Sequence, residues 1–395
     1  MSRPVYVVGV GMVPFAKPGK SDAYPTMGAN AARAALADAR VPYERIEQAY
    51  AGYVFGDSCS GQRALYQVGL SSIPIINVNN NCATGSTALF LARQAVASGA
   101  VECALALGFE QMVPGALRKM YTDRPTPLDE FAAAVDRKDG IDPEGPIAPQ
   151  YFAAAGRQYM KAHGTEASTF AKISVKARRH AANNPFALFR DPVTEEEVLA
   201  SPGIVAPLTR LQCCPPTCGA AAAVLCSADF AKAHGLDTRV VIAAQAMTSD
   251  VPGTFDEGDM MRVVGFDMAR RAAEQVFEQA GIGPSEVDVV ELHDCFTANE
   301  LITYEALGLT PPGTAERFVV EGDNTYGGRV VTNPSGGLLS KGHPLGATGL
   351  AQCTELVWHL RGTAGARQVE GARVALQHNL GLGGACVVTM YKTTT

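Results

Sequence analysis

The chain carries an internal sequence repeat that strongly constrains its fold. Residues 31–47 read as a helix, a short turn and the start of a strand, and residues 272–288 repeat this succession. Further along each copy, residues 82–87 (Cys-Ala-Thr-Gly-Ser-Thr) fall opposite residues 343–348 (His-Pro-Leu-Gly-Ala-Thr). Two matching units of this kind predict a duplicated α/β fold with a chemically active side chain at the start of equivalent helices.

A segment of different character separates the two copies. It is rich in charge and proline and contains helical patterns at residues 151–162 and 169–181. Such insertions commonly shape a binding site, and a purely structural lid is the alternative. We therefore expect an N-terminal half, an inserted domain and a C-terminal half, formed by residues 1–112 with 219–247, residues 113–218 and residues 248–395.

Charge and hydropathy exclude several classes of protein. The net charge of the 395 residues is −6, and no basic run with interleaved aromatic residues suggests a nucleic-acid surface. No stretch of about 18 uninterrupted apolar residues could span a bilayer. The chain opens on a strand pattern rather than a cleavable signal, and its last residues carry no peroxisomal tripeptide. We therefore expect a cytoplasmic protein, in which the ten scattered cysteines are reduced thiols.

Cys82 is the candidate nucleophile. It follows an apolar run, residues 73–78, that reads as a buried strand, and it precedes a small-residue helix pattern. A sulfur at such a junction meets the positive end of the helix dipole and free backbone N–H groups, which are expected to lower the pKa of the thiol. The alternative for a lone cysteine is a small buried core residue.

Three further segments favour the catalytic interpretation. Residues 293–296 (His-Asp-Cys-Phe) end a strand pattern, and residues 342–349 open a helix with a proline in its first turn. Residues 378–385 form a glycine-rich link between two strand-like runs. Because ligands and chemistry gather where the strands of α/β folds end, we expect these segments to lie near Cys82.

Two other patterns do not indicate a bound cofactor. The densest cysteine cluster lacks paired C-x-x-C elements, and its last member belongs to a core strand pattern, so we expect no metal there. Its members are Cys213, Cys214, Cys218 and Cys226. The glycines of residues 8–14 lack the third glycine and the following helix of a dinucleotide site.

Four segments, residues 77–90, 293–296, 333–349 and 377–384, together closely resemble the thiolase superfamily. More narrowly, nearly the whole chain resembles the sterol-carrier-protein-type (sterol carrier protein X) 3-ketoacyl-CoA thiolases. The resemblance implies a five-layer αβαβα fold of two related βαβαβαββ halves, with the insertion as a loop domain that receives coenzyme A. It also implies a homodimer, with residues 73–78 as an expected interface strand at the edge of its half.

The resemblance also implies a role for each candidate side chain. Cys82 matches the nucleophile, and His343 matches the histidine that activates it and donates to the thioester oxygen of the enolate. His293 stands where other thiolases have an asparagine and is expected to be a second donor to that oxygen. The backbone N–H groups of Cys82 and Gly381 match the hole for the tetrahedral oxyanion. At a helix start, the ring of His343 is expected to be neutral near pH 7.

One departure from ordinary thiolases indicates the subfamily. Those enzymes carry an acid/base cysteine in a Cys-x-Gly motif, but the matching triplet here begins with Asn379. In the sterol-carrier type the cysteine of His-Asp-Cys-Phe takes over this role, which implies Cys295. Cys386 lies nearby and is expected to be core. His163 and His180, on charged helices of the insertion, are expected to face solvent.

Three functions remain open. The first is cleavage of a 3-ketoacyl-CoA by CoA into a shortened acyl-CoA plus acetyl-CoA or propionyl-CoA, with CoA as cosubstrate and no permanently bound cofactor. The second is a steroid side-chain retro-aldol lyase, against which the pair Cys82 and Cys295 argues. The third is a non-catalytic acyl-CoA or lipid-binding protein. The chain ends at the thiolase core, so the fused lipid-carrier domain of longer relatives is not expected.

Overall fold

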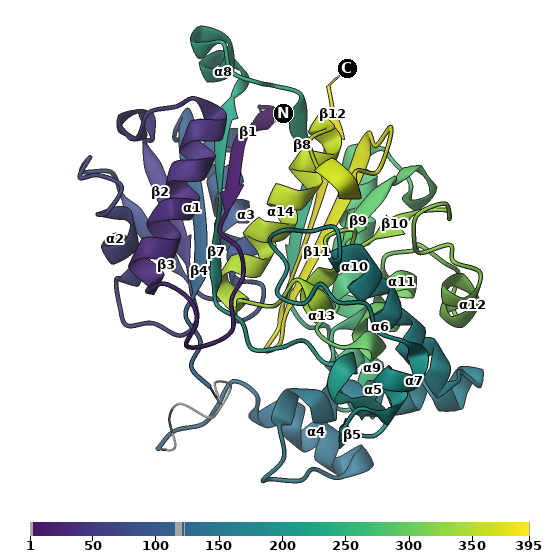
Figure 1. The fold of residues 1–395 in the computed structure, drawn as a ribbon. Helices are drawn as coiled ribbons and strands as arrows, with labels where there is room; N and C mark the ends of the chain where they lie inside the picture. Colours follow the sequence, from purple (N-terminus) through teal and green to yellow (C-terminus); the bar gives the residue numbers. More distant parts are fainter. Residues whose placement is uncertain (1–2, 115–120, 122, 395) are drawn as a thin grey trace.

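The strands form one ten-stranded sheet that consists of two five-stranded halves (Figure 1). The computed structural model describes residues 3–114, 121 and 123–394. The N-terminal half contains β1 (Val5–Met12), β2 (Gln48–Gly52), β3 (Ile75–Val78), β4 (Cys103–Glu110) and β7 (Gly219–Ser227). The C-terminal half contains β8 (Val240–Thr248), β9 (Val289–Glu291), β10 (Val331–Thr332), β11 (Val374–Gly381) and β12 (Ala385–Thr393).

The two halves have the same topology, as the internal sequence repeat predicts. Counted outward from the centre, the order is β1-β7-β4-β2-β3 in one half and β8-β12-β11-β9-β10 in the other. In each half the first two pairings are antiparallel and the last two are parallel. The halves join through one register pair of β1 and β8, Tyr6 with Val241. Strand β3 ends the sheet, which confirms its expected position at an edge.

Helices divide the halves into layers. The N-terminal half carries α1 (Tyr24–Ala39), α2 (Ser60–Leu65), α3 (Thr84–Ser98) and α8 (Ala228–His234). The C-terminal half carries α9 (Met260–Val263), α10 (Phe266–Ala280), α11 (Thr297–Ala306), α12 (Ala315–Val320), α13 (Gly337–Ser340) and α14 (Leu345–Arg361). Short 3₁₀ turns are η1 (Tyr43–Arg45), η2 (Arg210–Gln212), η3 (Pro284–Glu286) and η4 (Gly365–Arg367).

The layer order confirms the expected thiolase-like fold. Helix α1 packs on β1 and β7, and α10 packs on β8 and β12. Helices α3 and α14 pack on each other, and α14 also contacts β4 and β7 of one half and β11 of the other. Figure 1 shows α14 running between the two halves. The pair α3 and α14 is therefore the central layer of the five.

Close backbone approach brings the starts of the two central helices together. A Cβ atom at Gly108 of β4 would overlap the carbonyl oxygen of Gly346, in the first turn of α14. A Cβ at Gly85, in the first turn of α3, would lie 2.7 Å from that same oxygen. Because only glycine permits such contacts, these positions set the spacing of the two helix starts, and so of the residues just before them.

The inserted segment packs on the C-terminal half. It contains α4 (Asp129–Asp139), α5 (Ile147–His163), α6 (Ala167–Ala181), α7 (Glu195–Ala200) and the hairpin of β5 (Gly203–Val205) and β6 (Leu208–Thr209). Helices α5 and α6 confirm the two expected helical patterns. Helix α5 contacts α9 and α11, and α6 contacts α11, α12 and α13. Within the described residues, no helix has both the length and the apolar character needed to cross a membrane.

This packing overturns one prediction about the insertion. His163 is exposed as expected, but the prediction that His180 faces solvent is wrong, since only 2% of it is exposed. Its Nδ1 lies 3.0 Å from the carbonyl oxygen of Asn333, and its Nε2 lies 2.8 Å from Thr325 Oγ1. The charged face of α6 is covered by the C-terminal half, which the helical pattern alone does not reveal.

Candidate active site

The two halves place Cys82 and His343 at equivalent points. Cys82 lies two residues before α3 begins at Thr84, and His343 lies two residues before α14 begins at Leu345. Asn81 adopts a left-handed φ of 50°, which asparagine tolerates better than most residues. These equivalent helix starts confirm the correspondence between Cys82 and His343 that the internal sequence repeat indicates.

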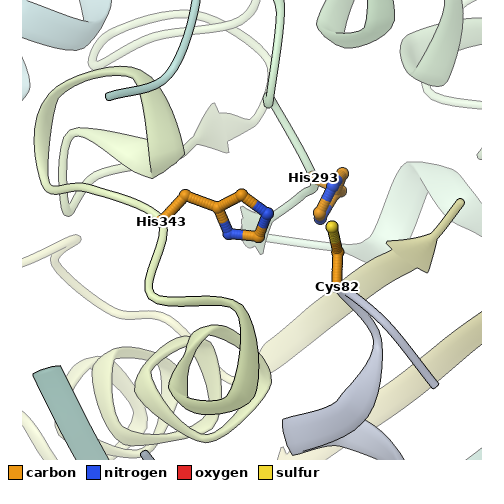
Figure 2. A group of neighbouring side chains, drawn as sticks. All are labelled: Cys82, His293 and His343. Carbon is orange, nitrogen blue, oxygen red and sulfur yellow. The ribbon is translucent and has the colours of Figure 1, made fainter. Parts of the chain in front are cut away.

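Three segments far apart in the sequence meet at one point. The Sγ atom of Cys82 and one ring nitrogen each of His293 and His343 lie within 4.8 Å of one another. The two ring centroids are 5.0 Å apart, and the rings are nearly perpendicular. In Figure 2 the sulfur points toward the ring of His293, and the ring of His343 reaches toward both. We call these three side chains the trio.

Two further predicted groups adjoin the trio. Cys295 is 5% exposed, and burial raises the pKa of its thiol. The thiolate forms of Cys214 and Cys82 raise this pKa further by charge repulsion, so the three sulfurs are neighbours. A Cβ at Gly381 would overlap the carbonyl oxygen of Asn80 and lie 3.0 Å from the amide nitrogen of Ala83. The backbones of Cys82 and Gly381 are therefore adjacent, as an oxyanion hole made of their N–H groups requires.

Hydrogen bonds assign the tautomer of His343. Its Nδ1 lies 2.7 Å from Thr348 Oγ1, and that hydroxyl donates its proton to the carbonyl oxygen of Pro344 at 3.0 Å. Because a carbonyl only accepts, the hydroxyl proton is already used, and the hydroxyl must accept from Nδ1–H. The Nε2 atom then carries a lone pair, and it has no hydrogen-bond partner in the described structure. His343 therefore presents a base to the trio.

The same reasoning gives His293 the opposite tautomer. Its Nδ1 lies 3.1 Å from Asn379 Nδ2, an amide nitrogen that can only donate. The Oδ1 atom of that amide accepts from the hydroxyl of Ser86 at 2.8 Å, which is consistent with this amide orientation. Nδ1 of His293 is then the acceptor, and its proton is on Nε2. His293 therefore presents a donor where His343 presents a base.

Burial keeps the nucleophile and its base uncharged at rest. It raises the pKa of Cys82 to about 12, against the opposing backbone N–H of Leu382, and it lowers the pKa of His343 to about 3. Burial, together with the neighbouring rings of His343 and His378, also lowers the pKa of His293. The expectation that the helix dipole lowers the thiol pKa of Cys82 is wrong, because desolvation of the thiolate is the larger effect. The neutral His343 ring is confirmed, with burial as its main cause.

These protonation states bear on the two expected donors. In the assigned tautomer His343 has no N–H to offer until its Nε2 takes a proton, so it can donate only after it has acted as a base. His293 can donate from the start. A neutral thiol and a neutral imidazole also give a site that transfers a proton during reaction rather than one that stores a thiolate.

The donor set fits a metal ion poorly. Among the described histidine, cysteine, aspartate and glutamate side chains, the trio is the group whose ligand atoms lie close enough together to hold a metal ion. A metal needs an unprotonated nitrogen from each ring. Asn379 holds the proton of His293 on Nε2, and the remaining lone pair on Nδ1 already accepts from the amide of Asn379.

The sequence cluster of four cysteines does not assemble into a metal site. Cys218 and Cys226 lie buried near and within β7. The backbone N–H of Cys214 instead donates to the carbonyl oxygen of Cys295 at 2.9 Å. The expected core position of Cys386 is confirmed.

Three residues of the site were not identified from sequence. Thr348 and Asn379 orient the two rings, and the buried carboxylate of Glu110 accepts the N–H of Gly346 at 3.0 Å. Burial raises the pKa of Glu110 to about 7, and its charge also raises the pKa of Cys82. Thr348 stands in the same motif as His343, which is a usable signal. In the sequence, Asn379 is distinguished only by the absence of the Cys-x-Gly cysteine at its position.

Comparisons with known proteins identify the family of the chain. Two family models match the chain, "Thiolase, N-terminal domain" over residues 5–229 and "Thiolase C-terminal domain-like" over residues 256–391. Sterol carrier protein 2 of Oryctolagus cuniculus is 56% identical over 98% of this chain and 72% of that protein. Non-specific lipid-transfer protein-like 2 of Caenorhabditis elegans is 44% identical over 98% of this chain and 96% of that protein.

Solved structures share the fold at lower identity. The Ltp2-ChsH2(DUF35) aldolase superposes with a TM-score of 0.83 at 24% identity, covering 99% of this chain and 98% of that one. Human mitochondrial 3-ketoacyl-CoA thiolase superposes with a TM-score of 0.74 at 20% identity, covering 99% of each chain.

Proposed function

The chain belongs to the thiolase family, and on that premise we propose that it is a 3-ketoacyl-CoA thiolase of the sterol-carrier-protein type. It cleaves a 3-ketoacyl-CoA with free CoA into a shortened acyl-CoA and acetyl-CoA, or propionyl-CoA when the substrate carries a 2-methyl branch. The observation that carries the proposal is the trio: the sulfur of Cys82 and one ring nitrogen each of His293 and His343 lie within 4.8 Å of one another. The assigned tautomers give His343 an Nε2 lone pair and His293 an Nε2–H.

The first half of the reaction forms an acyl-enzyme. As the sulfur of Cys82 attacks the 3-keto carbon, its proton passes to Nε2 of His343, and the backbone N–H groups of Cys82 and Gly381 hold the tetrahedral oxyanion. The bond between C2 and C3 then breaks, and its electron pair becomes the enolate of acetyl-CoA. Nε2–H of His343 and Nε2–H of His293 donate to the enolate oxygen, and the thiol of Cys295 protonates C2.

The second half transfers the acyl group to CoA. The thiolate left on Cys295 takes the proton of the CoA thiol, and the CoA sulfur attacks the thioester carbonyl on Cys82. The carbon–sulfur bond to Cys82 breaks, acyl-CoA leaves, and Cys82 regains its proton from His343. Each group returns to its starting state, so no metal or redox cofactor is needed to balance the cycle.

We extend the proposal to the binding partners. The inserted segment, residues 113–218, is the element proposed to receive CoA, a ligand that the related fold of human mitochondrial 3-ketoacyl-CoA thiolase holds in one solved structure. Strand β3 is the proposed contact of a homodimer, because it ends the sheet and its four residues are only partly buried. An unpaired strand edge with apolar side chains is usually covered by a partner.

Acyl transfer to Cys82 is the test of the proposal. Incubation with 3-ketooctanoyl-CoA in the absence of free CoA should add a hexanoyl group to the peptide that contains Cys82, detected by mass spectrometry. Cys82→Ser should remove this label. The matched control Cys59→Ser changes an exposed thiol and should leave the label in place. Label on Cys295 alone would contradict the assigned nucleophile.

The role of Cys295 separates thiolysis from the alternatives. Cys295→Ala should still accept an acyl group on Cys82 from a pre-activated thioester, but it should lose most turnover, about 100-fold or more, because proton transfer to C2 is lost. Full CoA-dependent turnover in this variant would contradict its acid/base role. Cleavage of a steroid side-chain CoA ester without free CoA would indicate a lyase, and the absence of any cleavage over straight, branched and steroid-derived substrates would indicate a binding protein.

A further inference from the structure

We propose that Asn379 is a positioning residue that holds the proton of His293 on Nε2, and that a buried chain of side chains sets the orientation of its amide. The catalytic meaning of this inference rests on the proposed function, but the proton position itself does not. This chain of hydrogen bonds runs from Tyr391 through Gln377 and Ser86 to Asn379, and it ends on Nδ1 of His293.

A backbone carbonyl anchors the direction of this chain. Nε2 of Gln377 lies 2.6 Å from the carbonyl oxygen of Gly349, in α14, which can only accept a hydrogen bond. The amide of Gln377 is therefore oriented with its nitrogen toward α14 and its oxygen toward the hydroxyl of Tyr391, which donates to it at 2.5 Å. The opposite amide orientation would place two oxygens against each other at 2.6 Å.

The anchored direction passes through two more residues. The second N–H of Gln377 points to Ser86 Oγ at 2.8 Å, so that oxygen accepts. The hydroxyl proton of Ser86 then goes to Oδ1 of Asn379 at 2.8 Å, and the amide nitrogen of Asn379 is left facing Nδ1 of His293 at 3.1 Å. A proton on that Nδ1 would oppose the amide N–H, so the ring keeps its proton on Nε2.

Burial makes this arrangement strict. Ser86, Gln377, Asn379 and Tyr391 have no exposed surface, and His293 is 1% exposed. Water therefore does not compete for these groups, and each hydrogen bond is stronger than it would be at the surface. A reversed amide would leave buried donors facing each other, which costs on the order of 1–3 kcal/mol per unsatisfied group.

The contact also links two departures from the ordinary thiolase pattern. By the resemblance to thiolases, position 293 matches an asparagine of ordinary members and position 379 matches their Cys-x-Gly cysteine. In this structure the two replaced positions touch, at 3.1 Å. The two positions therefore act as one unit: a histidine at position 293 can donate to an oxyanion because an amide at position 379 keeps its proton on Nε2.

The first test reads the proton position directly. In ¹⁵N-histidine-labelled enzyme without ligand, His293 should show a protonated Nε2 and an unprotonated Nδ1 near pH 7. Its signals are identified by comparison with His293→Gln. The opposite tautomer, or a mixture of both, would overturn the proposal. Because this measurement uses no substrate, it stands even if the chain proves to have another activity.

The second test reverses the amide. Asn379→Asp keeps the shape but offers a carboxylate, which accepts Nδ1–H and leaves a lone pair on Nε2. We expect kcat at pH 8 to fall about 100-fold with little change in KM, because the enolate oxygen loses one of its two donors. At lower pH the introduced carboxylate and the ring of His293 together take up one proton, Nε2–H returns, and most of the lost activity should return near pH 6.

Other titratable groups near His293 are common to the variant and the wild type. They are the rings of His343 and His378, the thiol of Cys82, and Asp294 and Cys295 on the same loop. Burial lowers the pKa of both neighbouring rings to about 3, so neither titrates between pH 6 and 8. Glu110, whose pKa burial raises to about 7, titrates in this range and acts on Cys82 in the wild type and the variant alike. The recovery is therefore measured as the difference between the two pH profiles.

A matched control separates positioning from damage. Asn324→Asp also adds a carboxyl to a buried asparagine, one whose amide donates to Tyr304 rather than to the trio. It should keep the pH profile of the wild type. A loss in Asn379→Asp that is equal at pH 6 and pH 8, or no loss at all, would overturn the proposal. If that variant does not fold, the tautomer measurement on the wild-type enzyme decides.

Discussion

His293 and His343 lie in similar surroundings but face the substrate site with opposite chemistry. Both are at least 96% buried, both are uncharged near pH 7, and both use Nδ1 to contact a neighbouring side chain. The partner of His343 is a hydroxyl that accepts, and the partner of His293 is an amide that donates. The direction of one hydrogen bond therefore decides which ring can be the base.

The two directions are set over different distances in the sequence. Thr348 lies five residues after His343, and the carbonyl that fixes its hydroxyl belongs to Pro344. The amide of Asn379 is 86 residues from His293, and its direction is fixed through α3, β11 and α14. Both series of hydrogen bonds nevertheless end on backbone carbonyls of the same segment, around the start of α14. This shared anchor makes the two rings a matched pair for experiment.

The largest expected effect comes from removing the base. His343→Ala should lower kcat on the order of 10²-fold or more, because it removes both the acceptor of the Cys82 proton and a donor to the enolate. His163→Ala, in an exposed position on α5, is the control and should leave kcat unchanged. Steady-state kinetics with a 3-ketoacyl-CoA measures both. A near-normal kcat for His343→Ala would show that the two rings are assigned wrongly.

The next effect concerns the hydroxyl that orients the base. Thr348→Val keeps the side-chain shape but removes the acceptor of Nδ1–H, so the ring can place its proton on Nε2 and lose its basicity toward Cys82. We expect kcat to fall about 10-fold at nearly constant KM. Thr348→Ser restores the hydroxyl and should recover most of the activity. Equal losses in both variants would indicate a packing defect.

A smaller effect is expected on the donor side. His293→Asn introduces the residue that ordinary thiolases have at this position, and its amide can still donate toward the enolate oxygen. We expect less than about a 10-fold loss of kcat, because one donor is replaced rather than removed. The comparison with His343→Ala under identical conditions is the measurement. An inactive His293→Asn beside an active His343→Ala would reverse the order proposed for the two rings.

The last expected effect appears in stability rather than rate. The pKa of His343 is about 3 in the folded chain and about 6.5 when unfolded, so between these values the unfolded state binds the proton. The stability that this group contributes is complete above about pH 6.5 and is lost as the pH falls toward 3. His343→Gln should therefore lose urea resistance less steeply than wild type between about pH 7 and 4. Parallel slopes would contradict the low pKa.

Much of this site follows from short stretches of sequence. The repeated helix-turn-strand pattern predicts the duplication, and the apolar run before Cys82 together with the helix pattern after it predicts the junction. His293 and His343 stand in motifs that end a strand or begin a helix, so their meeting point follows from the general geometry of α/β sheets. These features depend on residues near each other in the chain, where propensity and periodicity carry the information.

Only the tertiary structure decided the chemistry that these residues carry. The helix start before α3 suggests a low thiol pKa for Cys82, but the surrounding protein desolvates the sulfur and raises it to about 12. The charged helix pattern suggests an exposed His180, but α6 packs against α11, α12 and α13 and buries it. The tautomer of His293 depends on Asn379, whose amide direction comes from residues on separate strands and helices. Burial and hydrogen-bond direction arise from contacts between distant segments, so local sequence determined which residues meet and the assembled fold determined their protonation.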